Sequence, residues 1–126
     1  MENKKIYKYN YNNLGGEIIN QYGTYKRNKR NIRELIEYNG NIYKKIENID
    51  GFYNKAIIYQ NIKNSNNYIL LSYETIVSEY NGKYFDIFGY YSVTTARHLN
   101  YFFEKFGFKK LSKKEIETKS KYYFEN

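Results

Sequence analysis

Hydrophobic and polar residues alternate along much of the middle of this chain. From Ile69 to Tyr80, and again from Lys83 to Tyr91, β-branched and aromatic side chains recur at about every second position. A period of two residues is typical of a β-strand, because successive side chains point to opposite faces of the sheet. We therefore predict a strand over each of these segments, and a further strand over Lys55 to Gln60.

The dipeptide Asn-Gly follows the first of these strands, at Asn81-Gly82. It is the strongest short signal for a β-hairpin, because a two-residue type I′ turn requires a positive φ angle at both of its central residues. A turn centred on this dipeptide would pair Tyr80 with Lys83, and Ser78 with Phe85, across the two strands.

A second Asn-Gly, at Asn39-Gly40, lies in a more ambiguous context. The apolar residues of 31–38 have helical spacing, and the segment carries the residues of a capping box. Segment 31–38 is therefore either a helix or a strand. We favour a hairpin, because segment 41–44, beyond the turn, has the composition of a strand.

The C-terminal third carries a helical pattern instead. Ser92 is the expected N-cap, and Gly107 suits the left-handed residue that commonly follows the end of a helix. The helix should therefore span about 93–106. Its apolar stripe, at positions i, i+3, i+4 and i+7, consists of Leu99, Phe102, Phe103 and Phe106.

A capping box of Ser112 and Glu115 predicts a second, short terminal helix. Together these elements predict an α+β fold, in which an antiparallel sheet of hairpins is packed by one main C-terminal helix. A chain of 126 residues has room for one domain, and we expect it to span 1–126. Within it, 69–117 forms a hairpin–helix unit, and 1–68 is an unassigned, basic and aromatic part with β-strand signals.

Tyrosine is the most unusual feature of the composition, with 18 residues. A/T-rich codons account for this abundance on their own. Tyrosine also makes good binding surfaces, because it buries a large area at a small entropic cost. On that interpretation, one face of the predicted sheet is a binding surface that includes Tyr73, Tyr84 and Tyr90.

The formal net charge of +8 comes from the two ends of the chain. Residues 1–30 contain seven Lys and Arg residues against two acidic ones, and residues 104–126 contain seven against four. Basic ends favour contact with a polyanion, although a charge of this size also serves solubility. The best candidates for phosphate contacts form the densest basic cluster, Lys26, Arg27, Lys29 and Arg30.

Several classes of site lack their residues in this sequence. The chain has no cysteine, which excludes disulfides and cysteine-based zinc sites. Its acidic residues are scattered, and no Asp-x-Asp or Glu-x-x-His pair is present. We therefore expect no metal and no cofactor. No apolar run approaches the roughly 20 residues that span a bilayer, so we expect no membrane contact.

His98 is the only histidine and hence the only candidate general base of that type. Catalysis would need a nucleophile beside it and a group that orients its ring. Thr94 lies four residues earlier on the predicted helix, but no aspartate follows. We favour a structural role, in which His98 ties the helix to a polar group of the neighbouring strand, such as Ser72 or Thr75.

The order strand, Asn-Gly turn, strand and Tyr-Ser-x-Thr-Thr-x-x-His helix, within about 69–117, resembles a domain of unknown function in small phage- and plasmid-encoded proteins of low-GC bacteria. The resemblance implies a mobile-element context. Small phage proteins that act by binding often inhibit host defence, as anti-CRISPR proteins do. The residues that carry the motif are Ser72, Thr75, Ser92, Thr94, Thr95, Arg97 and His98.

From these observations we expect a non-enzymatic, phage-type binding protein that inhibits a bacterial defence complex. It would act in the cytoplasm of the host cell by occupying a protein or guide-RNA surface. The alternative is a small basic accessory protein or regulator that binds nucleic acid. The sequence predicts neither the oligomeric state nor the identity of the target.

Overall fold

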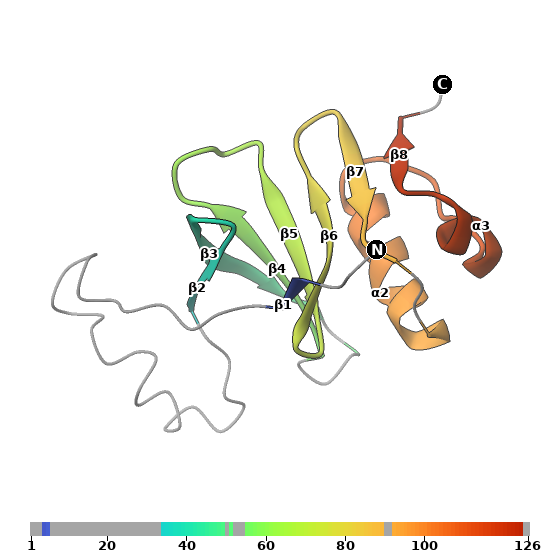
Figure 1. The fold of residues 1–126 in the computed structure, drawn as a ribbon, viewed down its shortest axis with the longest axis horizontal. Helices are drawn as coiled ribbons and strands as arrows, with labels where there is room; N and C mark the ends of the chain where they lie inside the picture. The colour runs from blue at the N-terminus through green and yellow to red at the C-terminus, as the bar shows by residue number, and fades with distance from the viewer. Residues whose placement is uncertain (1–3, 6–33, 50, 52–54, 90–91, 125–126) are drawn as a thin grey trace, which may run out of the picture.

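The computed structural model describes residues 4–5, 34–49, 51, 55–89 and 92–124. In these residues, eight strands form one antiparallel sheet, and one main helix with a short second helix packs beside it (Figure 1). The fold is therefore α+β, as predicted. The predicted phosphate-contact segment 26–30 lies outside the described residues.

Seven strands run across the sheet in chain order, and β1 pairs separately with β6. From β2 to β8, strands that are consecutive in the chain are antiparallel neighbours in the sheet. Both helices lie in the connection between β7 and β8. The strands are β1 (Lys4–Lys5), β2 (Leu35–Tyr38), β3 (Asn41–Asn48), β4 (Ala56–Asn61), β5 (Tyr68–Ser72), β6 (Thr75–Tyr80), β7 (Tyr84–Ile87) and β8 (Lys121–Tyr123).

The first Asn-Gly dipeptide forms the type I′ hairpin. Tyr38 pairs with Asn41, and the φ angles of Asn39 and Gly40 are 51° and 79°. Positive φ at both central positions is the signature of a type I′ turn. Residues 35–38 are therefore a strand, and the hairpin interpretation is confirmed.

We expect Gly40→Ala to lower the free energy of unfolding by about 1–2 kcal/mol, because an L-residue with a side chain resists the left-handed conformation. An added Cβ at Gly40 would meet no atom within 4 Å, so the cost is purely conformational. Asn39→Gly is the matched control and should change stability by less than about 0.5 kcal/mol. Urea denaturation measures both; equal stability of Gly40→Ala and the parent would contradict this account.

The second Asn-Gly dipeptide does not form the predicted turn. Ser78 pairs with Ile87 and Tyr80 with Phe85, and the Asn81 amide donates to the Tyr84 carbonyl. The turn is thus centred one residue later, on Gly82-Lys83, so the predicted pairing was wrong by two residues. Among these turn residues only Gly82 has a positive φ angle, the sign expected for a type II′ turn. The Asn81 side chain instead accepts hydrogen bonds from the amides of Lys83 and Tyr84.

The segment predicted as one long strand, 69–80, is two strands with a tight turn between them. Ser72 pairs with Thr75, so Tyr73 and Glu74 are the central residues of the turn. Tyr73 has a φ angle of 58°, the same sign as Gly82 at the equivalent position of the next hairpin. Residue type did not indicate this turn, because neither tyrosine nor glutamate is among the residues that turns usually select.

The helices agree with the predictions. Helix α2 (Val93–Lys105) begins after Ser92, whose hydroxyl accepts from the Thr95 amide. It ends in a Schellman motif, in which the Phe108 amide donates to the Phe103 carbonyl. Helix α3 (Lys113–Thr118) has the predicted capping box of Ser112 and Glu115. Strand β8, which follows α3, was not predicted.

The sheet buries side chains on both of its faces. Helix α2 covers one face, where Phe85 of β7 packs edge-on against Phe102 and Phe103. On the opposite face, residues such as Tyr43 and Tyr59 are also buried. No helix in the described parts of the chain is both long and apolar enough to cross a bilayer.

Candidate functional site

The single histidine lies in a buried cluster of hydroxyl groups between β5 and α2. Ser72 is the last residue of β5, and its Oγ lies 2.8 Å from Nδ1 of His98 and 3.3 Å from Oγ1 of Thr95. Thr95 and His98 are three residues apart, so they share the buried side of the helix. The predicted contact between His98 and Ser72 is present, and the Thr95 hydroxyl adds a third member to the cluster.

Burial controls the protonation of His98. The imidazole has no exposed surface, and burial, together with the positive charge of Arg97, lowers its pKa to about 4. The ring is therefore neutral at pH 7. A neutral, enclosed ring with such a low pKa suits a hydrogen-bonding role better than that of a general base, whose pKa should lie near the working pH.

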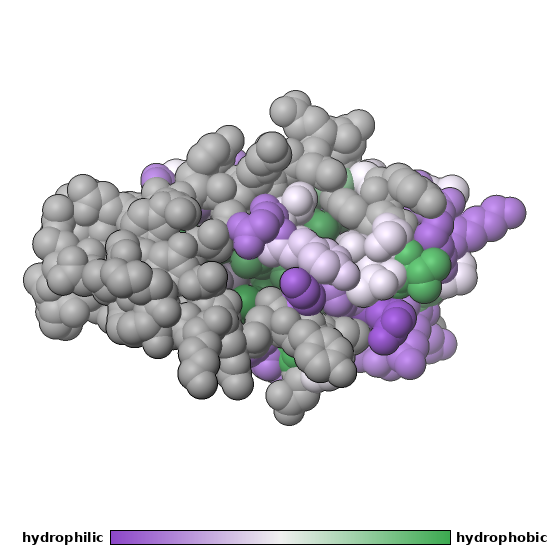
Figure 2. Space-filling model, turned by 90° about the horizontal axis from the view of Figure 1, so that it is seen from below, coloured by the Kyte–Doolittle hydropathy of each residue, from purple (hydrophilic) through white to green (hydrophobic). Residues whose placement is uncertain are grey.

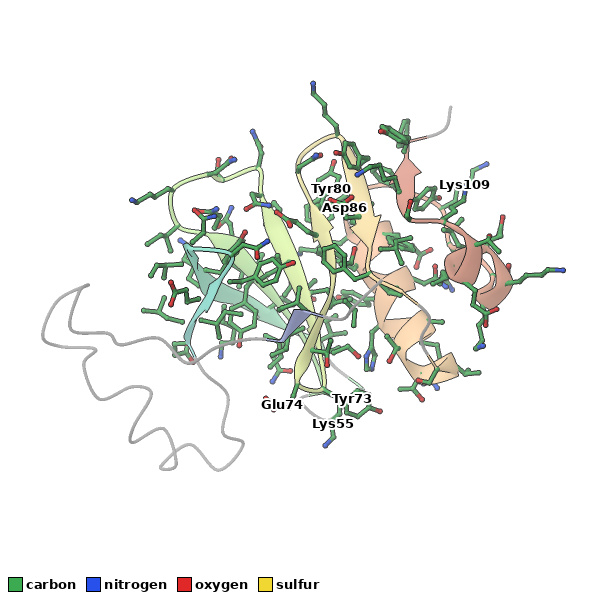
Figure 3. All side chains as sticks on the ribbon, in the orientation of Figure 1. Lys55, Tyr73, Glu74, Tyr80, Asp86 and Lys109 are labelled. Carbon is green, nitrogen blue, oxygen red and sulfur yellow. The ribbon has the colours of Figure 1, made fainter. Side chains whose placement is uncertain are left out.

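Tyr73 lies over this cluster at the tip of the β5–β6 turn. Its ring centroid is 5.8 Å from that of His98, and Nζ of Lys55 lies 5.7 Å from its centre. The Tyr73 amide also donates to the Lys55 carbonyl. We call Lys55, Tyr73 and Glu74 the Tyr73 turn; Figure 3 shows the three residues together at one end of the sheet.

The side chain of Tyr73 is open to solvent despite these contacts, with 47% of its surface exposed. Figure 2 views the molecule from this end, and among the coloured residues hydrophilic and hydrophobic groups are interspersed. A non-glycine residue in a left-handed conformation costs about 1–3 kcal/mol, and such residues concentrate at functional sites. The Tyr73 turn is therefore the strongest candidate contact site in the described residues.

The predicted tyrosine-rich face does not exist as one surface. Tyr73 is a turn residue, whereas Tyr84 begins β7 at the other end of β6. The missed turn at Tyr73-Glu74 separates them, because it removes Tyr73 from the alternation of the strand. Tyr90 lies outside the described residues.

The other motif residues have structural positions. Ser92 caps α2, and Thr94 is half-buried in its first turn. Thr75 is half-buried at the start of β6, opposite Ser72. Arg97 is exposed and belongs to a different feature, a shallow hollow on the outer side of α2.

This hollow has a volume of about 270 Å³. Asn100 fixes its wall, because its side chain both donates to the Leu111 carbonyl and accepts from the Leu111 amide. The lining carries charges of both signs, which gives the hollow no clear preference for one class of ligand. The lining residues are Arg97, Asn100, Tyr101, Glu104 and Lys110.

A second buried polar cluster was not foreseen. The Tyr43 hydroxyl donates to Oδ1 of Asn67 at 2.6 Å, Asn61 donates to the same oxygen, and Asn67 donates to Glu79. Burial, with a smaller effect of the Glu79 charge, raises the pKa of Tyr43 to about 12. The phenol therefore remains a donor, and the cluster holds both ends of the 61–67 loop.

Glu47, on β3, links the sheet to α2. It accepts hydrogen bonds from Lys105 and Tyr101. Burial raises the pKa of Glu47, but these two hydrogen bonds outweigh burial and lower it. The described residues contain no cluster of three or more His, Cys, Asp or Glu side chains that could hold a metal ion.

One family of known sequences matches a large part of the chain. The profile of a family described as "Family of unknown function (DUF8033)" matches residues 40–118. The matched range contains the Tyr73 turn, the cluster of Ser72, Thr95 and His98, and the hollow on α2, but ends before β8. No curated protein and no solved structure matches the chain.

Proposed function

The chain belongs to the family of unknown function DUF8033, and we propose that it is a non-enzymatic protein that binds a macromolecular partner through the Tyr73 turn. The observation that carries this proposal is the position of Tyr73. An aromatic residue is held exposed, at a φ angle of 58°, where the neighbouring hairpin has glycine.

The energetics of this position favour a role in contact rather than in folding. A glycine at Tyr73 would form the same turn without the steric cost of a left-handed tyrosine. Tyrosine is among the residues that most often dominate binding energy in protein interfaces. The strain therefore supports the proposal that Tyr73 is a binding anchor at the tip of the hairpin.

The groups beneath Tyr73 act as support for this anchor. Ser72, Thr95 and His98 are buried, and Ser72 is hydrogen-bonded to both of the others. The His98 ring packs near that of Tyr73. An anchor on a rigid base loses less entropy on binding than one on a flexible loop. This arrangement supports the choice of a binding protein over an enzyme built on His98.

The partner we propose is a protein or ribonucleoprotein of a bacterial defence system, met in the cytoplasm of the host cell. The resemblance of the hairpin–helix unit to phage- and plasmid-encoded proteins supports this class. The charges agree with a protein surface, because Lys55 and Glu74, of opposite sign, flank Tyr73. An aromatic centre with a polar rim is typical of protein interfaces.

A second candidate function is that of a small basic protein that binds nucleic acid. The observation that favours it is the net charge of +8, part of which lies on lysines near β8 and α3. Positive charge supplies contacts to phosphates, and these contacts do not depend on the base sequence of the nucleic acid.

We expect Tyr73→Gly to weaken binding to the partner without loss of stability. Removal of the ring should weaken binding by about 30-fold or more, as for an interface anchor worth about 2 kcal/mol. The variant loses the contacts of the ring with its neighbours but is relieved of the left-handed strain. We expect the second effect to offset the first, so the melting temperature should equal or exceed that of the parent. The test is phage plaquing on bacteria that carry a defined CRISPR system, followed by titration of the purified effector complex.

Tyr101→Ala is the matched control, because it removes a tyrosine of similar exposure (39%) from α2. Restored plaquing with the parent and with Tyr101→Ala, but not with Tyr73→Gly, supports the proposal. If Tyr73→Gly restores plaquing as well as the parent, the Tyr73 turn is not the contact site. If the parent itself neither restores plaquing nor binds the effector complex, the defence-complex partner is wrong.

A further inference from the structure

A second exposed aromatic surface lies at the edge of the sheet formed by β7 and β8. The rings of Tyr84 and Tyr123 pack with centroids 4.7 Å apart, and 55% of Tyr123 is exposed. Lys121 lies over the Tyr84 ring at 4.7 Å, and Lys83 precedes Tyr84 in the turn. We call Lys83, Tyr84, Lys121 and Tyr123 the β8 surface.

Alternation along β8 explains why its aromatic residues divide between core and surface. Tyr122 points to the face covered by α2 and is buried, where its hydroxyl donates to the Lys109 carbonyl. Tyr123 points the other way, beside Tyr84. Phe124 is also 55% exposed and rests on Phe108. The core therefore needs Tyr122, whereas Tyr123 adds mainly exposed aromatic surface.

The charge around this surface is positive. Lys121 forms an ion pair with Asp86 at 2.7 Å, whereas Lys83 is in no ion pair among the described residues. The acidic residues in 107–124 are only Glu115 and Glu117. The lysines of that segment are Lys109, Lys110, Lys113, Lys114, Lys119 and Lys121.

From this arrangement we infer that the β8 surface binds single-stranded nucleic acid. Bases would stack on Tyr123 and Tyr84, and the phosphates would lie against Lys83 and Lys121. Exposed aromatic rings beside lysines are the chemistry by which proteins bind single strands without sequence preference. A duplex is a poorer match, because its bases already stack on one another and offer no free face.

The inference deepens the second candidate function and is independent of the Tyr73 turn. The β8 surface lies at the end of β6 opposite Tyr73, and Lys119, Lys121 and Tyr123 lie beyond the family match, which ends at residue 118. A negative result at one surface therefore leaves the other unaffected.

The test is fluorescence anisotropy with labelled oligo-dT and oligo-rU of about 12 nucleotides, a length within the usual site sizes, and with a duplex of equal length. We expect both single strands to bind more tightly than the duplex. Tyr123→Ala should weaken binding to them by roughly 5- to 150-fold, the loss of one stacked base. Tyr123→Phe, which keeps the ring, should bind like the parent.

The charge contribution is tested by Lys83→Gln combined with Lys121→Gln. Removal of each phosphate contact should reduce the slope of log affinity against log salt by about 0.7. The matched control, Lys44→Gln with Lys63→Gln, removes the same charge from β3 and from the adjoining β4–β5 loop, and should leave the slope nearly unchanged.

Three results would overturn the inference. The parent could fail to bind either single strand at low salt. Tyr123→Ala could bind as tightly as the parent, which would mean that nucleic acid is held by positive charge alone and not by base stacking on the β8 surface. The two lysine pairs could have equal effects on the salt slope, which would locate the phosphate contacts elsewhere on the chain.

Discussion

Replacement of Phe85 by alanine is expected to lower the free energy of unfolding by about 3–5 kcal/mol. Phe85 is completely buried, and its ring packs on Phe102, Phe103 and Phe108 at centroid distances of 4.7 to 5.1 Å. Truncation would leave a cavity at the point where β7, α2 and the segment after α2 meet. A small domain has a total stability of about 5–15 kcal/mol, so the variant should be marginal at 37 °C.

Urea denaturation measures this effect, and Phe124→Ala is the matched control. Phe124 loses the same atoms from an exposed position, so it should cost less than about 1 kcal/mol. Phe102 and Phe103, predicted as core residues from the helical stripe, are both completely buried, and alanine at either position should resemble Phe85→Ala. Equal midpoints for Phe85→Ala and Phe124→Ala would show that the aromatic core is misassigned.

Acidification is expected to destabilise the protein through His98. Burial holds the folded-state pKa at about 4, below the ordinary value of 6.5, so the unfolded chain binds a proton more readily than the folded one. The stability contributed by His98 is complete above pH 6.5 and is lost as the pH falls from 6.5 to about 4. The whole loss should be about 3 kcal/mol, since one pKa unit corresponds to about 1.4 kcal/mol.

His98→Gln isolates this contribution, because glutamine does not titrate and keeps the ability to hydrogen-bond to Ser72. Carboxylates such as Glu47 titrate in both proteins, so the difference between the two stability curves reports His98 alone. The parent should lose its advantage over His98→Gln between pH 6.5 and about 4. A constant difference over this range would mean that the ring is protonated or accessible in the folded state. A folded His98→Gln protein should also keep the binding proposed for the Tyr73 turn.

The reliable sequence signals were those in which a few neighbouring residues fix the local backbone. The Ser92 cap, the Ser112 and Glu115 capping box and the left-handed Gly107 all act within one turn of their helix. The apolar stripe of α2 located the buried side of that helix for a similar reason, because its period is set by the helix itself.

The candidate site was only partly predictable. The contact between His98 and Ser72 was one of two that the sequence offered, the other being with Thr75, whereas the third member of the cluster, Thr95, was not named for it. The position of Tyr73 did not follow, because its residue type disfavours the conformation that it adopts. The β8 surface was missed for another reason: β8 has three residues, too few for a period to be recognised.

By itself the sequence determined the α+β class, the helix ends and the apolar stripe of α2, because local propensity and hydrophobic period act over short distances. It favoured the hairpin at Asn39-Gly40 but left segment 31–38 open between helix and strand. Tertiary structure alone decided the turn at Tyr73 and the shift of the next turn to Gly82-Lys83. Pairing across β5, β6 and β7 buries both faces of the sheet, and the free energy of that burial exceeds the roughly 1–3 kcal/mol that a left-handed tyrosine costs. The same long-range packing brings β8 beside β7 and divides the exposed aromatic residues between the two ends of the sheet.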